Sequence, residues 1–552
     1  MRSLIALLGI TAVFATPQTP LTVNKHAWDA VPTPTVHLDD ATFTGEIYYD
    51  TAQFLGIPYA EPPVEDLRFR PPKPVGKYVG DHNATEWGFS CPQQRIKIPG
   101  KKDPNLAKNL DSAVDPMYEK DVPENEDCLT INVVTPLNAG TTANLPVLVW
   151  IYGGAFEFGG TASYNGSSIV SRATKFETPI IFVSMNYRVN GFGFMASKEV
   201  KAAGVGNLGL EDQRLALRWV QKYISAFGGD PKKVTIWGQS AGAISVSLQM
   251  IMNGGDNEGL FRGGIMQSGG PIPVGDIEHG QIYYDDVVKK TGCEDATDTL
   301  DCLRRVPYSK LKGAIDESPD IFAFQGLVLA WLPRVDGRVL VEPPQHSVLG
   351  DRVADVPFIT GTLCFGLIAL SVTDVHLRDF LHDYMAPEAT DHELDLVLLH
   401  YPSFPPAGCP FDTGFRNNLG PQFKRIAAIQ GDIVFHGPRR MMLNFNLARK
   451  EKAWSFLSKR SKWVPYIGSY HGHDLSNSFG TGEMRDYIIR FTVNLDPNGR
   501  VGLGIPWPNY EVTNPKALVF QDNALFPMKI QTDDYRKEAI EFAGNLSLIH
   551  PI

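Results

Sequence analysis

Residues 233–248, KVTIWGQSAGAISVSL, decide the fold of this sequence. The first third of this stretch is typical of a buried strand, and the last third is typical of a buried helix. Ser240 lies between them in a Gly-x-Ser-x-Gly pattern formed with Gly238 and Gly242. A strand that turns sharply into a helix crowds the positions two before and two after its tip, which favours glycine at both. The sequence therefore predicts Ser240 at a strained tip at the start of a helix, where a nucleophile can be exposed.

Two groups of backbone NH donors are expected around Ser240. The start of a helix favours negative charge, and the NH of Ala241 can point at an oxyanion there. The glycine-rich loop at 153–160, which contains Gly154 and Ala155, follows an apolar run and predicts further donors. Glycines let NH groups approach a substrate oxygen without obstruction by side chains. A glycine-rich turn without a catalytic part is the alternative for this loop.

A general base is expected in the loop Gly-Ser-Tyr-His-Gly-His-Asp-Leu at 468–475. His471 is the candidate because it lies in a glycine-flanked loop after an apolar run, where this kind of fold places its histidine. His473 is the rival, and either histidine read alone would more often be structural.

Short apolar runs that alternate with helical patterns predict an α/β protein with a large, mostly parallel central sheet and helices on both faces. Because no linker, repeat or low-complexity stretch divides the chain, we expect one domain over residues 16–552. The expected strands are 145–152, 179–186, 233–237, 263–267, 356–361, 453–457 and 517–521, and the clearest expected helices are 211–225 and 484–493.

Composition excludes several classes of protein. The 552 residues are 43 % hydrophobic and 20 % charged, which excludes a disordered, collagen-like or coiled-coil chain. The 51 basic and 61 acidic residues give a net charge of −10, so a nucleic-acid partner is not expected. No Cys-x-x-Cys or His-rich cluster indicates a metal, and we expect no cofactor.

The first residues resemble a secretory signal. Arg2 precedes the apolar run 4–14, which is shorter than the roughly 20 residues that span a bilayer. Small or apolar residues before a cleavage site after Ala15 predict a signal peptide over 1–15 and a secreted protein, with a buried N-terminal strand as the alternative. Secretion permits glycans at Asn83, Asn165 and Asn545, each of which begins an Asn-x-Ser/Thr sequence.

Six cysteines, at positions 91, 128, 293, 302, 364 and 409, favour structural disulfides in a secreted chain. Six cysteines allow fifteen complete pairings, and spacing alone does not choose among them. Cys293 and Cys302 are near enough in sequence to close a small surface loop.

Several motifs occur together in one order, and by them the chain resembles the type-B carboxylesterase/lipase family of α/β hydrolases. This family includes cholinesterases, and the pattern is closest to extracellular fungal lipases and sterol esterases. The motifs are Phe54 to Ala60 with Leu67-Arg68-Phe69, Glu126 to Leu129, Trp150 to Phe156, Asn186-Tyr187-Arg188, Asn207 to Gln213, Phe227 to Pro231, Gly238 to Gly242 and the tail Tyr535-Arg536-Lys537.

The resemblance implies roles for individual residues. Ser240 would be the nucleophile and His471 the base, with the NH groups of Gly154, Ala155 and Ala241 as an oxyanion hole. It also implies the disulfides Cys91–Cys128 and Cys293–Cys302, with the first loop acting as a lid. The choline-binding tryptophan that cholinesterases carry in this loop is absent from residues 92–127. Cys364 and Cys409 remain as a predicted third disulfide.

The sequence departs from the family at the triad acid. The family has an Asp-Glu-Gly segment after the strand at 356–361, whereas here no carboxylate lies between Asp355 and Asp374, and Phe365 stands near the expected glutamate. Asp374 is better explained as the first residue of a following helix. Loss of the acid leaves the histidine without the group that fixes its tautomer, so we expect reduced activity and an acid position filled by apolar side chains or water.

The leading functional hypothesis is a secreted serine carboxylic ester hydrolase that forms an acyl-enzyme on Ser240, with Ser240 Oγ in hydrogen-bond reach of His471. Uncharged, fairly apolar small-molecule or lipid esters are the expected substrates, with transient contact to a lipid interface. The alternative is a non-catalytic binding or adhesion-type member of the same fold. A third interpretation is an imperfect gene model that lacks the Asp-Glu-Gly segment.

Overall fold

A large mixed β-sheet forms the centre of the computed structural model, which describes residues 32–98, 104–114, 122–362, 373–446 and 452–552. Its order is β14-β13-β12-β11-β10-β9-β7-β8-β6-β4-β3. The strands are β3 (Glu46–Tyr48), β4 (Thr51–Pro58), β6 (Thr130–Pro136), β7 (Leu145–Ile151), β8 (Ile181–Met185), β9 (Gly229–Gln239), β10 (Gly263–Gln267), β11 (Phe358–Thr362), β12 (Ala453–Lys459), β13 (Lys516–Gln521) and β14 (Met528–Thr532).

The seven central strands of this order, β13, β12, β11, β10, β9, β7 and β8, run parallel to one another. Antiparallel strands flank them. β6, β4 and β3 extend one edge and β14 the other. A separate small sheet consists of β1 (Thr35–Leu38), β2 (Asp40–Thr44) and β5 (Val79–Asn83). All seven expected strands are present, with bounds shifted by a few residues, and the expected parallel arrangement is confirmed for the centre of the sheet.

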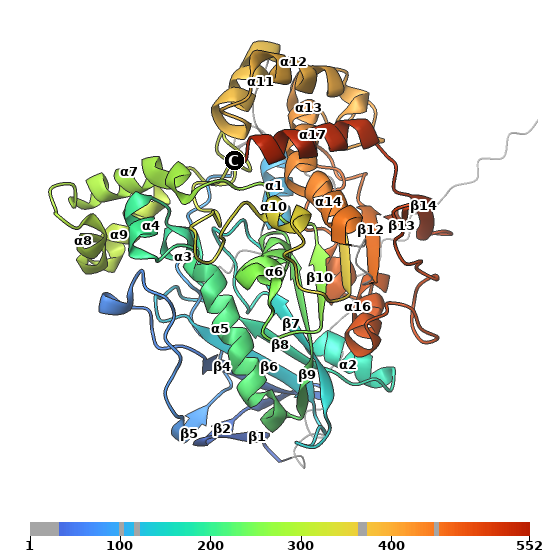
Figure 1. The fold of residues 1–552 in the computed structure, drawn as a ribbon. Coiled ribbons are helices and arrows are strands. Elements are labelled where there is room, and N and C mark those ends of the chain that lie inside the picture. The colour runs from blue at the N-terminus through green and yellow to red at the C-terminus, as the bar shows by residue number, and fades with distance from the viewer. Residues whose placement is uncertain (1–31, 99–103, 115–121, 363–372, 447–451) are drawn as a thin grey trace, which may run out of the picture.

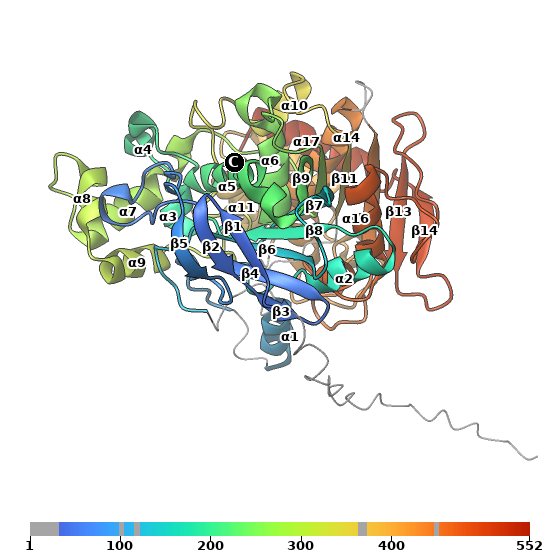
Figure 2. The ribbon, with the colours of Figure 1, turned by 90° about the horizontal axis from the view of Figure 1, so that it is seen from below.

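Helices cover both sides of the sheet (Figures 1 and 2). α5 and α6 pack on one face, with α6 against β9 and β10, and α2 and α16 contact the strands on the other. The helices are α1 (Pro104–Val114), α2 (Ser167–Lys175), α3 (Asn190–Phe194), α4 (Lys198–Ala203), α5 (Leu208–Tyr223), α6 (Ala241–Ile251), α7 (Gln281–Thr291), α8 (Thr299–Arg305), α9 (Tyr308–Asp316), α10 (Pro344–Leu349), α11 (Asp374–Phe380), α12 (Asp391–His400), α13 (Phe423–Gly431), the π-helix η8 (Asp432–His436), α14 (Gly437–Asn446), α15 (Leu475–Phe479), α16 (Glu483–Asn494) and α17 (Lys537–Ile549).

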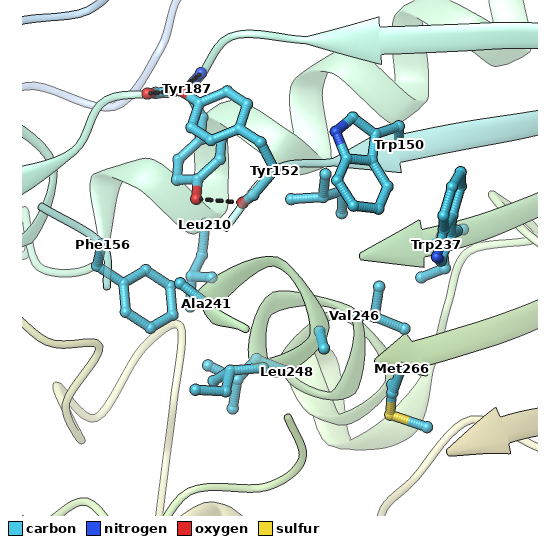
Figure 3. Packing of buried hydrophobic residues seen from close by; sticks show 14 of the residues in the cluster. Trp150, Tyr152, Phe156, Tyr187, Leu210, Trp237, Ala241, Val246, Leu248 and Met266 are labelled. Atoms are coloured by element: carbon cyan, nitrogen blue, oxygen red, sulfur yellow. Dashed lines mark hydrogen bonds between the residues drawn. The ribbon is translucent and has the colours of Figure 1, made fainter. Parts of the chain in front are cut away.

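The core lies between the sheet and its helices. Trp150 of β7 and Trp237 of β9 are fully buried, and their ring centroids are 4.3 Å apart. Figure 3 shows both rings together with Val246 of α6, which belongs to the same cluster. Because each tryptophan removes a large apolar area from water, this packing fixes the register of the two strands that lead to the glycine turns.

Two of the disulfides are those that the resemblance implied. Cys91 is bonded to Cys128 with an S–S distance of 1.99 Å, and Cys293 is bonded to Cys302 with an S–S distance of 2.02 Å. Cys409 is also disulfide-bonded, whereas its predicted partner Cys364 lies outside the described residues. No described helix has the length and apolarity needed to cross a membrane. The predicted signal peptide, 1–15, lies outside the described residues.

Candidate active site

Ser240 lies at the turn between β9 and α6 in a backbone conformation that few side chains adopt. Its φ is 56° and its ψ is −125°. A Cβ on Gly238 would lie 2.3 Å from the backbone of Gly242, and a Cβ on Gly242 would lie 2.0 Å from the carbonyl oxygen of Ile151. The predicted crowding on both sides of the serine is therefore present. The Ser240 NH donates to the carbonyl oxygen of Gln267 at the end of β10, which holds the turn in place at 2.9 Å.

The loop that follows β7 passes directly beside Ser240. A Cβ on Gly153 would meet the Cβ of Ser240 at 2.9 Å, so only a glycine permits this approach. Gly154 has a φ of 123° and Ala155 a φ of 58°, and both bend the loop around the serine. Within the described part of the chain, the NH groups of Gly154, Ala155 and Ala241 donate to no acceptor. These are the three predicted oxyanion donors.

A narrow apolar cavity of about 30 Å³ opens at Ser240. Ser240 itself lines it, together with Ala155, Phe156, Ala241 and Ile244. The remaining described lining residues are aliphatic or aromatic: Ile272, Ile321, Leu327, Leu329, Leu332, Val434, Phe435 and Ile552. A cavity with such walls favours apolar groups over charged ones.

His471 reaches the nucleophile turn from the loop after β12. Its ring is half-buried, and its centroid lies 5.2 Å from that of Phe435, which lines the cavity. Its Nε2 lies 3.4 Å from Nε2 of Gln239, the residue before the serine. Burial first, and the neighbouring His473 second, lower the pKa of His471 to about 3, so the imidazole is neutral at neutral pH.

The predicted hydrogen bond between Ser240 and His471 is not formed, and the structure describes both residues. The amide of Gln239 stands at the histidine nitrogen instead. Both ring nitrogens of His473, the rival base, contact other groups. Its Nε2 lies 3.0 Å from Oγ of Ser458, and its Nδ1 lies 2.6 Å from the carbonyl oxygen of Tyr470. His471 therefore remains the candidate base.

Asp374 is a helix-start residue, as the sequence favoured. It opens α11, accepts a hydrogen bond from Gln422 Nε2 at 2.7 Å, and pairs with Arg425 at 2.9 Å. Its carboxylate is therefore held by α13 rather than presented to His471. Cys364, Phe365 and the rest of the expected acid position lie outside the described residues.

A buried polar network under the nucleophile turn was missed from the sequence. Asp474 is fully buried, and its Oδ2 accepts a hydrogen bond from Gln267 Nε2 at 3.0 Å. Gln267 Oε1 in turn accepts from Trp237 Nε1 at 2.6 Å. Burial raises the pKa of Asp474 to about 7. The sequence feature that could have indicated this network is a polar side chain within an apolar run, such as Gln267 at the end of a strand.

A π-helical turn brings one wall of the cavity into place. η8 joins α13 to α14, and such single π turns are frequent at functional sites. Val434 and Phe435 of η8 face the cavity, while the buried Asp432 pairs with Arg536 on the opposite side. Thr362 Oγ1, at the end of β11, lies 2.8 Å from Nδ1 of His436 and ties the turn to the sheet.

The disulfide loop carries a helix that packs beside the histidine loop. Leu106 and Leu110 of α1 contact Phe423 and Ile467 in a small apolar cluster. Of the predicted glycan acceptors, Asn83 and Asn545 are exposed. The third, Asn165, is half-buried, and its Oδ1 accepts from the backbone NH of Ser167 at 2.9 Å. No described group of side chains could hold a metal ion.

Comparisons with known proteins show the family of this chain. The model of the carboxylesterase family matches residues 32–497. The chain is 41 % identical to Lipase 4 of Diutina rugosa over 517 residues, which cover 90 % of this chain and 93 % of that protein. It is 40 % identical to Secreted lipase 1 of Botryotinia fuckeliana over 504 residues, which cover 87 % and 88 %.

Among solved structures, EstA of Aspergillus niger superposes with a TM-score of 0.79 at 26 % identity, covering 94 % of this chain and 99 % of EstA. One relative, the inactive carboxylesterase-like protein VdtD of Byssochlamys spectabilis, is 32 % identical over 338 residues, which cover 58 % of this chain and 54 % of that protein. With the family model spanning most of the chain and relatives near 40 % identity over nearly all of it, this chain, an α/β-hydrolase fold, belongs to the carboxylesterase family.

Proposed function

We propose that this chain is a secreted serine carboxylic ester hydrolase that acts through an acyl-enzyme on Ser240. The observation that carries the proposal is the position of Ser240, at a strained turn between three NH donors and in the wall of an apolar cavity. Strain of this kind costs about 1 to 3 kcal/mol and persists where it serves the function of a site.

The reaction begins when Ser240 Oγ attacks the ester carbonyl carbon and its proton passes to Nε2 of His471. The NH groups of Gly154, Ala155 and Ala241 stabilise the oxyanion, and the alcohol leaves with the proton from His471. Water then attacks the acyl-enzyme and gives a proton to His471; the bond between the acyl carbon and Ser240 Oγ breaks, His471 returns the proton to Ser240 Oγ, and the acid is released. Proton transfer to His471 requires its Nε2 to leave the 3.4 Å contact with Gln239. The neutral imidazole set by its low pKa is the form that accepts a proton.

Apolar, uncharged esters are the proposed substrates because the cavity walls are almost entirely aliphatic or aromatic. Transient contact with a lipid surface is supported by three exposed aromatic residues, Phe404, Phe415 and Trp463. Phe404 and Phe415 contact each other, and Asn417 donates to the carbonyl oxygen of Lys462, which joins their loop to that of Trp463. Disulfides and relatives named as secreted lipases support secretion of a single domain over residues 16–552 after loss of residues 1–15.

Labelling with a fluorophosphonate probe tests the proposal. We expect the wild-type protein to be labelled and Ser240→Ala to remain unlabelled, since only an activated serine attacks the probe. Ser168→Ala is the matched control, because Ser168 is an exposed serine of α2 whose hydroxyl donates to the carbonyl oxygen of Phe479. An unlabelled wild-type protein would instead support the non-catalytic binding alternative, which the missing Ser240–His471 hydrogen bond and the inactive relative favour.

We also propose that the activity is reduced, because the sequence has no carboxylate between Asp355 and Asp374. In serine proteases loss of the triad acid lowers kcat on the order of 10⁴-fold. Phe365→Glu is expected to raise kcat on the order of 10³-fold or more, and Phe365→Gln, of similar size but uncharged, should not. Equal rates in the two variants would show that an acid is not what limits the reaction.

A further inference from the structure

The cavity beside Ser240 is lined in part by a residue from the far end of the sequence. The side chain of Ile552 lines this cavity and is 5 % exposed. Figure 1 shows α17 crossing the upper part of the molecule toward the point marked C, which returns the chain toward its centre. Ile552 therefore contributes to the cavity although it lies more than half the sequence away from Ser240.

Backbone hydrogen bonds hold Ile552 in this position. Its NH donates to the carbonyl oxygen of Pro273 at 2.8 Å, and its carbonyl oxygen accepts from the NH of Gly275 at 2.7 Å. Nη1 of the buried Arg334 donates to the same carbonyl oxygen at 3.2 Å. Ile272, next to this segment, also lines the cavity. Because none of these bonds involves the side chain of Ile552, its replacement changes the cavity without removing the groups that fix the backbone.

The position of the oxyanion donors indicates which part of an ester enters the cavity. Ala155 and Ala241 line it, whereas His471, which the structure also describes, is not among its lining residues. The leaving alcohol takes its proton from the histidine and so departs on the side of His471. The cavity on the other side of the carbonyl carbon then receives the acyl chain.

We propose that Ile552 sets the length of the acyl chain that the site accepts, an inference that rests on the proposed esterase function. The cavity of about 30 Å³ has room for roughly two water-sized groups, so the wild-type site accepts short, unbranched aliphatic acyl chains. The Ile552 side chain occupies the space into which a longer chain would extend. Its removal opens that space, and a larger side chain fills more of it.

The test compares kcat/KM for p-nitrophenyl acetate, butyrate and octanoate among variants. Ile552→Ala is expected to raise the octanoate-to-acetate ratio about ten-fold or more, since each methylene accepted by an apolar pocket is worth about 10-fold or more in selectivity. Ile552→Phe is expected to lower the butyrate-to-acetate ratio. Ile549→Ala is the matched control: it makes the same chemical change three residues away, on a side chain that is 63 % exposed, and should leave both ratios unchanged.

Ratios that stay unchanged in both Ile552 variants, with the protein folded by circular dichroism, would overturn the inference. If Ile552→Ala does not fold, Ile552→Val shortens the side chain by a single methylene and should shift the octanoate-to-acetate ratio in the same direction. Fluorophosphonate labelling distinguishes a failure of the role of Ile552 from a failure of the proposed esterase function. A labelled protein with unchanged ratios overturns only the role of Ile552, whereas an unlabelled wild-type protein overturns the esterase function and this inference with it.

Discussion

At the scale of single residues, the turn at Ser240 shows how neighbours enforce an unfavourable conformation. The positive φ of Ser240 is kept because its NH is bonded to Gln267 and its carbonyl oxygen accepts from Ile244 at 2.9 Å. Both partners belong to elements buried in the core. The serine is thus held by β10 and α6, and its hydroxyl remains available at the cavity.

Gln239 occupies the position at His471 Nε2 where the sequence predicted the hydroxyl of Ser240. The sequence placed His471 against Ser240, whereas the structure places the Gln239 amide at its Nε2. The side-chain oxygen of Gln239 is buried and has no hydrogen-bond partner within the described part of the chain. An unpaired buried acceptor costs about 1 to 3 kcal/mol, which lowers the cost of moving this amide when substrate binds.

Asp474 predicts a specific pH dependence of stability. Its pKa is about 7 in the folded protein and 3.8 in the unfolded chain, so the folded state favours the neutral acid. This contribution to stability is present below pH 3.8 and is lost as the pH rises to 7, at about 1.4 kcal/mol for each unit of difference. Asp474→Asn keeps an amide oxygen for Gln267 and removes the charge, so its stability relative to wild type should rise between pH 4 and pH 7 and level off above.

Urea unfolding of both proteins at pH 5 and pH 8 measures this difference. The wild-type value also includes His471 and His473, whose lowered pKa values make stability fall as the pH drops below 6.5. The same contribution is present in the variant, so it cancels in the difference. An equal difference in unfolding free energy at the two pH values would mean that Asp474 is charged in the folded protein.

At the scale of elements, glycines decide how closely strands and helices approach. The β9 to α6 turn requires Gly238 because a Cβ there would lie 2.3 Å from backbone atoms, which cannot rotate away. Similarly, η8 brings Phe435 to the cavity because one π turn changes the direction of side chains within a continuous helix. Neither Gly238 nor η8 supplies a catalytic group, but both determine where Ser240 and the cavity wall lie.

Gly238→Ala is expected to abolish fluorophosphonate labelling and to destabilise the protein by about 1 to 3 kcal/mol or more, the usual cost of overpacking. Gly313→Ala is its matched control. A Cβ at position 313 in α9 meets nothing within 4 Å, so this change should raise the melting temperature slightly, because alanine is favoured over glycine in a helix by about 1 kcal/mol. Thermal unfolding and labelling check both results, and a fully labelled Gly238→Ala protein would contradict the crowding argument.

At the scale of the whole molecule, the candidate site combines segments that are far apart in sequence. Residues near 155, 240, 329, 434 and 552 line one cavity, and His471 contacts Gln239 beside it. The disulfide Cys91–Cys128 closes the loop whose α1 packs beside the histidine loop through Leu106 and Phe423. The cavity walls therefore depend on the packing of α17 and η8 as much as on the nucleophile turn.

The sequence by itself determined the strand, turn and helix around Ser240, the order of the parallel strands along the chain and the helix-start role of Asp374. These features follow from local rules: β-branched residues favour strands, glycines permit crowded turns, and an acidic residue stabilises the start of a helix. Two disulfides and the family followed from motifs that keep a fixed order, such as Glu126 to Leu129.

Only the tertiary structure decided what surrounds the site. No local pattern indicates that Gln239 contacts His471, that Asp474 is buried beneath the turn, or that Ile552 lines the cavity. Each depends on contacts between residues more than 200 positions apart, whose energies arise from burial and hydrogen-bond geometry in the assembled core. A local sequence pattern records the conformation of its own segment, but it does not record which distant segment packs against it.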